Sequence, residues 1–179
     1  FGDRVYKKAT ASYIIEPGTL AVTSPVMKLV KEFIKKGVPV LGICNGFQIL
    51  VKAGVLPGRL EQNKSKEFYC NWTECEVVGD SFFGDASLLN KTYKIPVAHG
   101  YGRYEIDEKE YSKLEKNKQI FLKYKNGNPN GSYKNIAGIT NKEKTVFGMM
   151  PHPERTPDGS YFMKAIENYT SRSSLNKLQ

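Results

Sequence analysis

A repeating pattern of apolar positions predicts an amphipathic helix between Ser24 and Gly37. The apolar residues recur at intervals of three and four, which places them on one helical face. They are Val26, Leu29, Val30, Phe33 and Ile34. Ser24 and Pro25 are a side-chain cap and the residue favoured at the first helical position. Gly37 follows two lysines, whose charge suits the C-terminal end of a helix.

The next stretch of the chain predicts a strand, a sharp turn and a second helix. Residues 38–43 form a nearly continuous apolar run, which is typical of a strand buried on both faces. Residues 45–53 are predicted to form a helix that ends near Gly54. A helix followed by a buried strand and another helix is typical of an α/β fold.

The rest of the chain is richer in predicted strands. Strands are expected at 68–78, 92–98 and 119–124, a loop at 125–132, and a hairpin formed by 136–140 and 145–150. Residues 160–169 are expected to form the last helix, and the polar residues 170–179 a flexible tail. With no internal repeat or linker, residues 1–179 are interpreted as a single domain.

Composition narrows the class of protein. The net charge is +9, but the lysines are scattered and are not interleaved with stacking aromatic residues. This favours a solvated lysine-rich surface, or a face that docks an acidic protein, over a nucleic-acid site. No apolar stretch approaches the roughly 20 residues that span a bilayer. The three cysteines lack zinc-ligand spacing, so we expect reduced thiols in a cytoplasmic protein without a metal site.

Cys44 stands at a candidate nucleophile elbow. The segment Gly42-Ile43-Cys44-Asn45-Gly46 has the G-x-S-x-G pattern with cysteine in place of serine, between a predicted strand and a predicted helix. The helix N-terminus would favour a thiolate, and the Asn45 amide could donate to an oxyanion. From this pentapeptide alone, a nucleophile and a buried structural cysteine are equally consistent.

A thiol nucleophile needs a base, and the chain has two histidines, His99 and His152. His152 lies between two prolines, which are expected to hold the segment extended so that His152 and Glu154 point to the same side. Glu154 would then orient the imidazole as the third member of a triad. His99 lies in a glycine-rich segment and is interpreted as a loop residue.

These residues together resemble motifs of the class I glutamine amidotransferases. Residues 42–48 resemble their nucleophile motif, and residues 151–154 their histidine-glutamate motif. The resemblance implies a mostly parallel central sheet flanked by helices, flavodoxin-like in plan. It also implies that Cys44, His152 and Glu154 hydrolyse glutamine through a thioester.

Within that family, residues 95–100, 102–104 and 151–155 resemble the glutaminase subunits of phosphoribosylformylglycinamidine synthase, an enzyme of purine synthesis. The resemblance implies substrate-binding residues at Asn45, Gly46, Gln48, Asn63, Ser65 and Phe68. It implies two partners: a large synthetase subunit that uses ATP, and a small accessory subunit. No cofactor is expected in this chain, since ATP and magnesium would belong to the synthetase.

The start of the chain departs from the family pattern. The chain begins at Phe1 instead of methionine, and residues 1–3 resemble the end of a glycine-rich segment that contributes to the oxyanion hole. We therefore expect the opening β-α-β portion, with the second oxyanion donor, to lie before Phe1.

Three other interpretations stay open. The first is a glutaminase that supplies imidazole-glycerol-phosphate or pyridoxal phosphate synthesis, with the same cysteine chemistry. The second is a different enzyme with a nucleophile elbow, although an acid two residues after the histidine is unusual for such triads. The third is a basic RNA-binding protein with a dead site, which would bind RNA in a salt-dependent manner.

Overall fold

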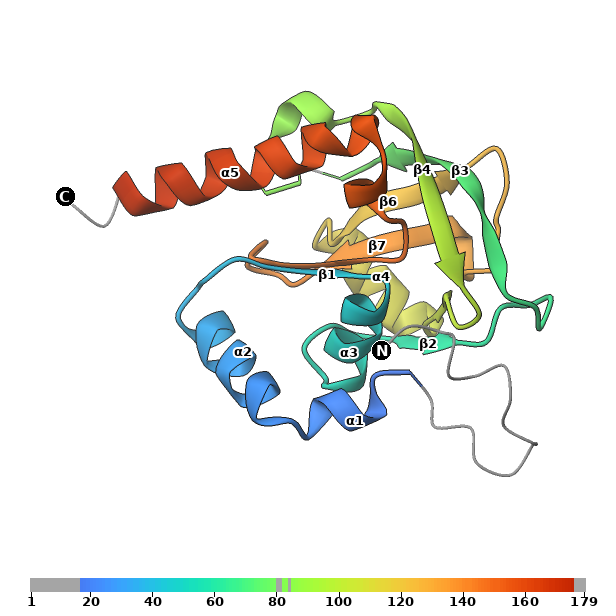
Figure 1. The fold of residues 1–179 in the computed structure, drawn as a ribbon, viewed down its shortest axis with the longest axis horizontal. Coiled ribbons are helices and arrows are strands. Elements are labelled where there is room, and N and C mark those ends of the chain that lie inside the picture. The colour runs from blue at the N-terminus through green and yellow to red at the C-terminus, as the bar shows by residue number, and fades with distance from the viewer. Residues whose placement is uncertain (1–16, 80–81, 84, 176–179) are drawn as a thin grey trace.

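A six-stranded sheet runs through the computed structural model, in the order β1-β8-β7-β6-β3-β4, beside a two-stranded sheet of β2 and β5 (Figure 1). The structure describes residues 17–79, 82–83 and 85–175. The strands are β1 Val40–Ile43, β2 Arg59–Glu61, β3 Tyr69–Val77, β4 Thr92–His99, β5 Arg103–Glu105, β6 Ile120–Lys125, β7 Ile136–Thr140 and β8 Val146–Met149. The α-helices are α1 Thr19–Val22, α2 Pro25–Lys35, α3 Asn45–Lys52, α4 Glu108–Lys116 and α5 Ser160–Leu175.

Helices cover both faces of the large sheet (Figure 1). On one face, Phe162 and Ala165 of α5 belong to an apolar cluster with residues of β3, β4, β6 and β8. On the other face, α2, α3 and α4 contribute to a second cluster. Strand β8 lies between the two, because Phe147 belongs to the first cluster and Val146 to the second. Its successive side chains point to opposite faces, as they must in a strand.

The local predictions for the first half of the chain are confirmed. Helix α2 begins after Ser24, whose hydroxyl accepts a hydrogen bond from the Met27 amide at 3.2 Å. Strand β1 and helix α3 follow in the predicted order. One part of the expectation was wrong: β1 is only partly buried, since three of its four residues are of intermediate exposure. Its position at the end of the described sheet explains this, because among the described residues only β8 pairs with it.

The expected predominance of parallel strands does not hold in the described residues. The pairing of β1 with β8 is parallel, whereas β8–β7, β7–β6, β6–β3 and β3–β4 are antiparallel. A parallel pair needs a crossover of a dozen or more residues, usually helical. The predicted hairpin of β7 and β8 has only residues 141–145 between its strands, so its pairing must be antiparallel.

The large sheet curls back on itself near the edge at which β1, β8 and β4 end. Although β4 and β8 are not neighbours in the sheet order, the His152 amide donates to the Pro96 carbonyl of β4 at 2.9 Å. The segment that follows β8 therefore lies against β4. This closure gives the sheet the form of a half-barrel and brings distant segments to one edge.

Two expectations about the chain ends have different outcomes. Helix α5 continues to Leu175, so the prediction that it ends at Tyr169 was wrong, and residues 176–179 of the expected tail lie outside the described residues. Residues 1–3, compared above with a glycine-rich segment, also lie outside them. Within the part of the chain that is described, no helix is long and apolar enough to cross a membrane.

We predict that Gly148→Ala destabilises the fold, because Gly148 is where α3 meets β8. A Cβ atom there would lie 2.2 Å from the Phe47 ring and 2.7 Å from Leu56. Overpacking of this kind costs about 1–3 kcal/mol of the free energy of unfolding, which urea denaturation would measure. Gly100→Ala is the matched control, since within the described part of the chain its Cβ would meet only Phe68, at 3.8 Å. Equal stability of the two variants would contradict the prediction.

Candidate active site

Cys44 occupies a strained turn between β1 and α3. Its backbone angles are φ 51° and ψ −105°, outside the regions that non-glycine residues normally adopt. The turn is held at both ends, since the Cys44 amide donates to Met149 at 2.8 Å and the Cys44 carbonyl accepts from the Gln48 amide at 3.1 Å. Such strain persists only where the surroundings impose it and is common at functional sites. The geometry is that of a nucleophile elbow.

The two glycines of the elbow have different roles. A Cβ at Gly42 would lie 2.7 Å from the Gly46 backbone and 2.6 Å from Leu50, so the close approach of strand and helix requires glycine there. Among the described residues, no atom lies within 4 Å of the position that a Cβ at Gly46 would take. Packing therefore requires glycine at position 42, whereas no described neighbour requires it at position 46. The structure leaves open space on the side of Gly46 where a side chain would lie.

His152 and Glu154 form the expected pair. The His152 Nδ1 atom lies 2.7 Å from the Glu154 Oε1 atom. The imidazole is buried, while the Glu154 side chain is 40% exposed. The segment is not extended as predicted: Pro153–Arg155 forms a 3-10 turn, η4, and the Arg155 amide donates to the His152 carbonyl at 3.2 Å. Proline at the first helical position favours this turn, because its φ is already helical.

The parallel pairing of β1 and β8 places the two motifs at one edge of the sheet. Ile43 pairs with Met149, so Cys44 and the segment that leads to His152 both leave the sheet at its carboxyl edge. Strand β4 reaches the same place, since the Cys44 Sγ atom lies 3.8 Å from the Ala98 carbonyl oxygen. The structure thus brings together motifs that lie far apart in the sequence. The Asn45 amide, at the first position of α3, has no intrahelical acceptor and can serve an oxyanion.

Gln48 borders a hollow near the elbow. Its side chain is 5% exposed, and its Nε2 atom donates to the Tyr101 carbonyl at 2.5 Å. Both residues line a hollow of about 290 Å³. The other lining residues are Pro17, Val51, Lys52, Gly58, Arg59, Leu60 and Glu61.

The predicted binding residues Asn63, Ser65 and Phe68 differ in their exposure. Asn63 is buried and anchors the loop of residues 62–68, whereas Ser65 and Phe68 lie on its exposed rim. Asn63 is 1% exposed; its Nδ2 atom donates to the carbonyls of His99 and Glu67, and its Oδ1 atom accepts from the Gly102 amide. These bonds and a contact with the His99 ring use the capacity of the amide, so the prediction that Asn63 itself contacts substrate is not supported. Ser65 and Phe68 are exposed.

His99 is a buried residue and not the loop histidine that the sequence suggested. It ends β4, is 0% exposed, and its ring lies 3.1 Å from Asn63 Oδ1 and 3.5 Å from Asn130 Nδ2. The pKa of His99 is lowered to about 4, mainly by burial, and the charge of the nearby His152 acts in the same direction. Its alternation with Val97 and Ile95 along β4 was the sequence signal that could have revealed its burial.

The other cysteines differ from Cys44 in their surroundings. No disulfide joins any of the three, all of which lie in the described residues. Cys70 is exposed on β3, and Cys75 is buried in the core, where burial raises the pKa of its thiol well above the ordinary value. Cys75 is therefore an inert core residue. Within the described ranges, no three histidine, cysteine or acidic residues gather as metal ligands.

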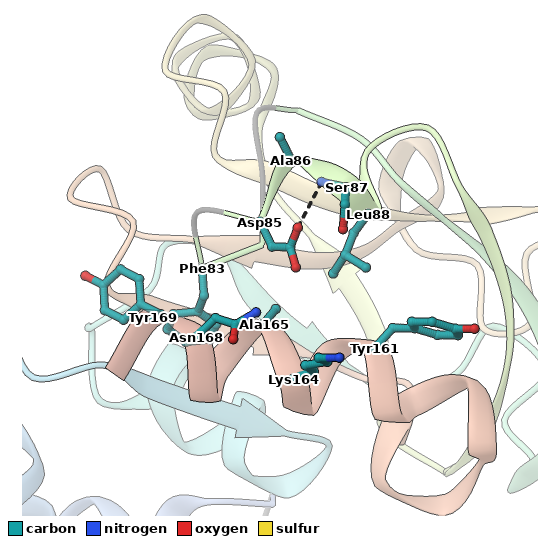
Figure 2. A pocket seen from close by; sticks show the side chains of 10 residues that line it. All are labelled: Phe83, Asp85, Ala86, Ser87, Leu88, Tyr161, Lys164, Ala165, Asn168 and Tyr169. Carbon is teal, nitrogen blue, oxygen red and sulfur yellow. Dashed lines mark hydrogen bonds between the residues drawn. The ribbon is translucent and has the colours of Figure 1, made fainter. Parts of the chain in front are cut away.

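A second hollow, of about 460 Å³, lies between α5 and the 3-10 turn η2 Ala86–Leu88 (Figure 2). Tyr161, Lys164 and Asn168 line it from α5, and Asp85, which accepts from the Ser87 amide at 2.9 Å, lines it from the other side. None of the residues that line it belongs to the elbow or to the His152–Glu154 pair. The chemistry of the candidate site lies elsewhere.

Comparison with known proteins finds relatives that all belong to the glutamine amidotransferases. A family model for the CobB/CobQ-like glutamine amidotransferase domain matches residues 10–175. Phosphoribosylformylglycinamidine synthase subunit PurQ of Wolinella succinogenes is 47% identical over 142 residues, which cover 79% of this chain and 65% of that protein. PurQ of Aquifex aeolicus is 44% identical over 153 residues, 80% of this chain and 67% of that protein. The chain thus spans about two thirds of the length of these curated relatives.

Solved structures agree with this result. A chain in the structure of PurLQS from Thermotoga maritima matches with a TM-score of 0.75 and 36% identity, over 86% of this chain and 72% of that one. A structure from Thermoplasma acidophilum, described as a GMP synthase protein, matches with a TM-score of 0.56 at 16% identity. That match extends over 87% of this chain and 71% of the other, and it supports the fold alone. The expected amidotransferase fold is confirmed, with the mixed sheet described above.

We predict that Gly159→Ala disturbs the candidate site from outside. A Cβ at Gly159 would lie 1.5 Å from the Pro153 carbonyl oxygen, so the turn that carries His152 and Glu154 would have to move. We expect iodoacetamide to alkylate Cys44 about tenfold more slowly at neutral pH, because the thiol loses its base. Lys164→Ala, at an exposed position of α5, is the control. An unchanged rate of alkylation in Gly159→Ala would contradict the prediction.

Proposed function

The chain belongs to the CobB/CobQ-like glutamine amidotransferase domain family, and we propose that it is the glutaminase part of a phosphoribosylformylglycinamidine synthase. The observation that carries the proposal is the position of Cys44, on a strained elbow at the sheet edge where the His152–Glu154 pair also lies. A thiol, an oriented imidazole and an amide at a helix N-terminus are what thioester chemistry requires. The names and identities of the PurQ relatives support the choice of pathway.

In the first half of the proposed reaction, the Cys44 sulfur attacks the side-chain amide carbon of glutamine. A carbon–sulfur bond forms, and the negative charge that develops on the carbonyl oxygen is stabilised by the Asn45 amide. His152 takes the thiol proton and delivers it to the amide nitrogen as the carbon–nitrogen bond breaks. Ammonia leaves, and a γ-glutamyl thioester stays on Cys44. Glu154 stabilises the cationic imidazole during this transfer.

In the second half, water hydrolyses the thioester. His152 accepts a proton from the water as its oxygen attacks the thioester carbon, and the carbon–sulfur bond breaks. The sulfur regains a proton, and glutamate leaves. The net reaction converts glutamine and water into glutamate and ammonia, so it needs no redox or metal cofactor for its balance.

We place glutamine in the space between the elbow and the hollow beside Gln48. The open side of Gly46 gives the substrate access to the sulfur, and Gln48 and Tyr101 border the hollow on that side. The loop of residues 62–68 forms the rim, with Ser65 and Phe68 as candidate contacts. Asn63 holds this loop in place from within.

The proposed product, ammonia, passes to a partner. The Thermotoga maritima neighbour is described as PurLQS, and we propose that this chain likewise serves a large ATP-using, magnesium-dependent synthetase and a small accessory subunit. The cytoplasm fits this role, because Cys44 must stay a reduced thiol. A role confined to RNA binding would leave the strained elbow and the oriented imidazole without a use.

We predict that Cys44→Ala abolishes glutamine-dependent synthesis while ammonia-dependent synthesis by the assembled complex continues. A glutamine-derived electrophile should label wild-type Cys44, which mass spectrometry of the tryptic peptides would locate. Cys75→Ala, which removes the buried core cysteine, is the control that should keep the labelling. Glutamine-dependent turnover by the Cys44→Ala complex would refute the assignment of the nucleophile.

We predict that His152→Ala slows thioester formation by about 10²–10⁴-fold, the usual contribution of a positioned acid–base residue. The rate would be measured as single-turnover release of ammonia from glutamine. Glu154→Gln should retain more activity, because a neutral amide can still accept the hydrogen bond that orients the ring. A wild-type rate in His152→Ala would remove histidine from the mechanism.

A further inference from the structure

His99 lies directly behind the proposed catalytic centre. It follows Ala98, whose carbonyl oxygen is 3.8 Å from the Cys44 sulfur, and it precedes the segment whose Tyr101 carbonyl accepts from Gln48. The imidazole itself is completely buried. It therefore cannot take part in the chemistry directly, and its function must act through its neighbours.

The hydrogen bonds around the ring determine which nitrogen carries the proton. Asn63 donates through Nδ2 to the carbonyls of His99, at 2.8 Å, and Glu67, at 2.9 Å, so its Oδ1 atom must face the ring. That oxygen can only accept, and it lies 3.1 Å from His99 Nδ1. The proton is consequently on Nδ1.

The second ring nitrogen faces a donor. Asn130 donates through Nδ2 to the Gly102 carbonyl at 2.7 Å, while its Oδ1 atom accepts from the Ser132 hydroxyl at 2.6 Å. The Nδ2 group also donates to the Tyr124 hydroxyl at 3.2 Å and lies 3.5 Å from His99 Nε2, so Nε2 faces a group that can only donate. A proton on both nitrogens would set the Nε2–H group against the Asn130 amino group, so these contacts favour the neutral ring.

Packing also confines the imidazole. A Cβ at Gly102 would lie 2.4 Å from the ring, which shows that the backbone of residue 102 is in close contact with it. The ring thus joins three segments: the end of β4, the loop of residues 62–68, and the segment that contains Asn130. Two of these segments border the proposed glutamine site.

We propose that His99 is a positioning residue for glutamine, which fixes the rim loop 62–68 against the end of β4 through its Nδ1–H bond to Asn63. This inference rests on the proposed function. The rim would contact the part of glutamine that does not react, so His99 should govern binding and leave the reactivity of the sulfur unchanged.

The lowered pKa of His99, about 4, is consistent with this role. His152 is the titratable group that acts on it by charge, and it must become cationic during the proposed reaction. A neutral His99 avoids a second positive charge beside it. The tie to Asn63 therefore persists through the catalytic cycle at neutral pH.

Two amide variants in the assembled complex separate the two hydrogen bonds of the ring. His99→Asn keeps a donor near the position of Nδ1, whereas His99→Gln keeps polar atoms only near Nε2. We expect His99→Gln to raise the KM for glutamine about 10- to 100-fold with kcat changed less than about threefold, and His99→Asn to restore most of the binding. Iodoacetamide should alkylate Cys44 at the wild-type rate in both variants.

Several outcomes would overturn the inference. Equal KM values for the two variants would show that the Nδ1–H bond has no special role, and a loss confined to kcat would place His99 in the chemistry. Thermal unfolding of each variant identifies any that fails to fold, and the other variant, compared with wild type, still tests the bond. Cys44→Ala in the same assay tests the proposed function separately: if it retains glutamine turnover, that function fails, whatever the His99 variants do.

Discussion

The hydrogen bond from the Cys44 amide, just after β1, to the carbonyl of Met149, the last residue of the parallel strand β8, determines the arrangement of the site. Because β1 and β8 run in the same direction, the chain leaves both at one edge of the sheet. One exit turns sharply into α3 and presents the sulfur, and the other turns into η4 and presents the imidazole. In an antiparallel pair the two motifs would lie at opposite edges. One register thus sets the relation between residues more than 100 positions apart in the sequence.

The curvature of the sheet adds a third segment to this edge. Strand β4 is the far end of the sheet in its hydrogen-bonding order, yet its Pro96 carbonyl accepts from His152 and its Ala98 carbonyl lies near the sulfur. The half-barrel therefore surrounds Cys44 with backbone groups from β4, β8 and α3. Glycines occur where these layers touch most closely, at Gly42, Gly148 and Gly159. Each would place a Cβ atom within 2.7 Å of a neighbouring atom.

Local patterns in the sequence were sufficient to predict several of the elements that position the candidate site. The cap at Ser24, the elbow at Cys44 and the β7–β8 hairpin are short-range features, and the structure confirms them. Helix α4 was missed, although Asp107 caps it by accepting from the Glu110 amide at 2.8 Å, because its polar sequence hides the two buried residues Tyr111 and Leu114. The antiparallel order of the sheet and the partners of the His99 ring, Asn63 and Asn130, depend on contacts between distant segments. Periodicity does not encode such contacts, and they could not be derived from it.

In the loop of residues 62–68, the residue that holds the loop in place is different from the residues that form its exposed surface. Asn63 uses its hydrogen-bonding groups inside the protein, whereas Lys64, Lys66 and Glu67 are exposed. Changes at the exposed positions alter what the loop meets without disturbing how it is held. Substitutions at these exposed positions can therefore adapt the rim to a different neighbouring molecule, one residue at a time, while the site that we propose for glutamine keeps its anchor.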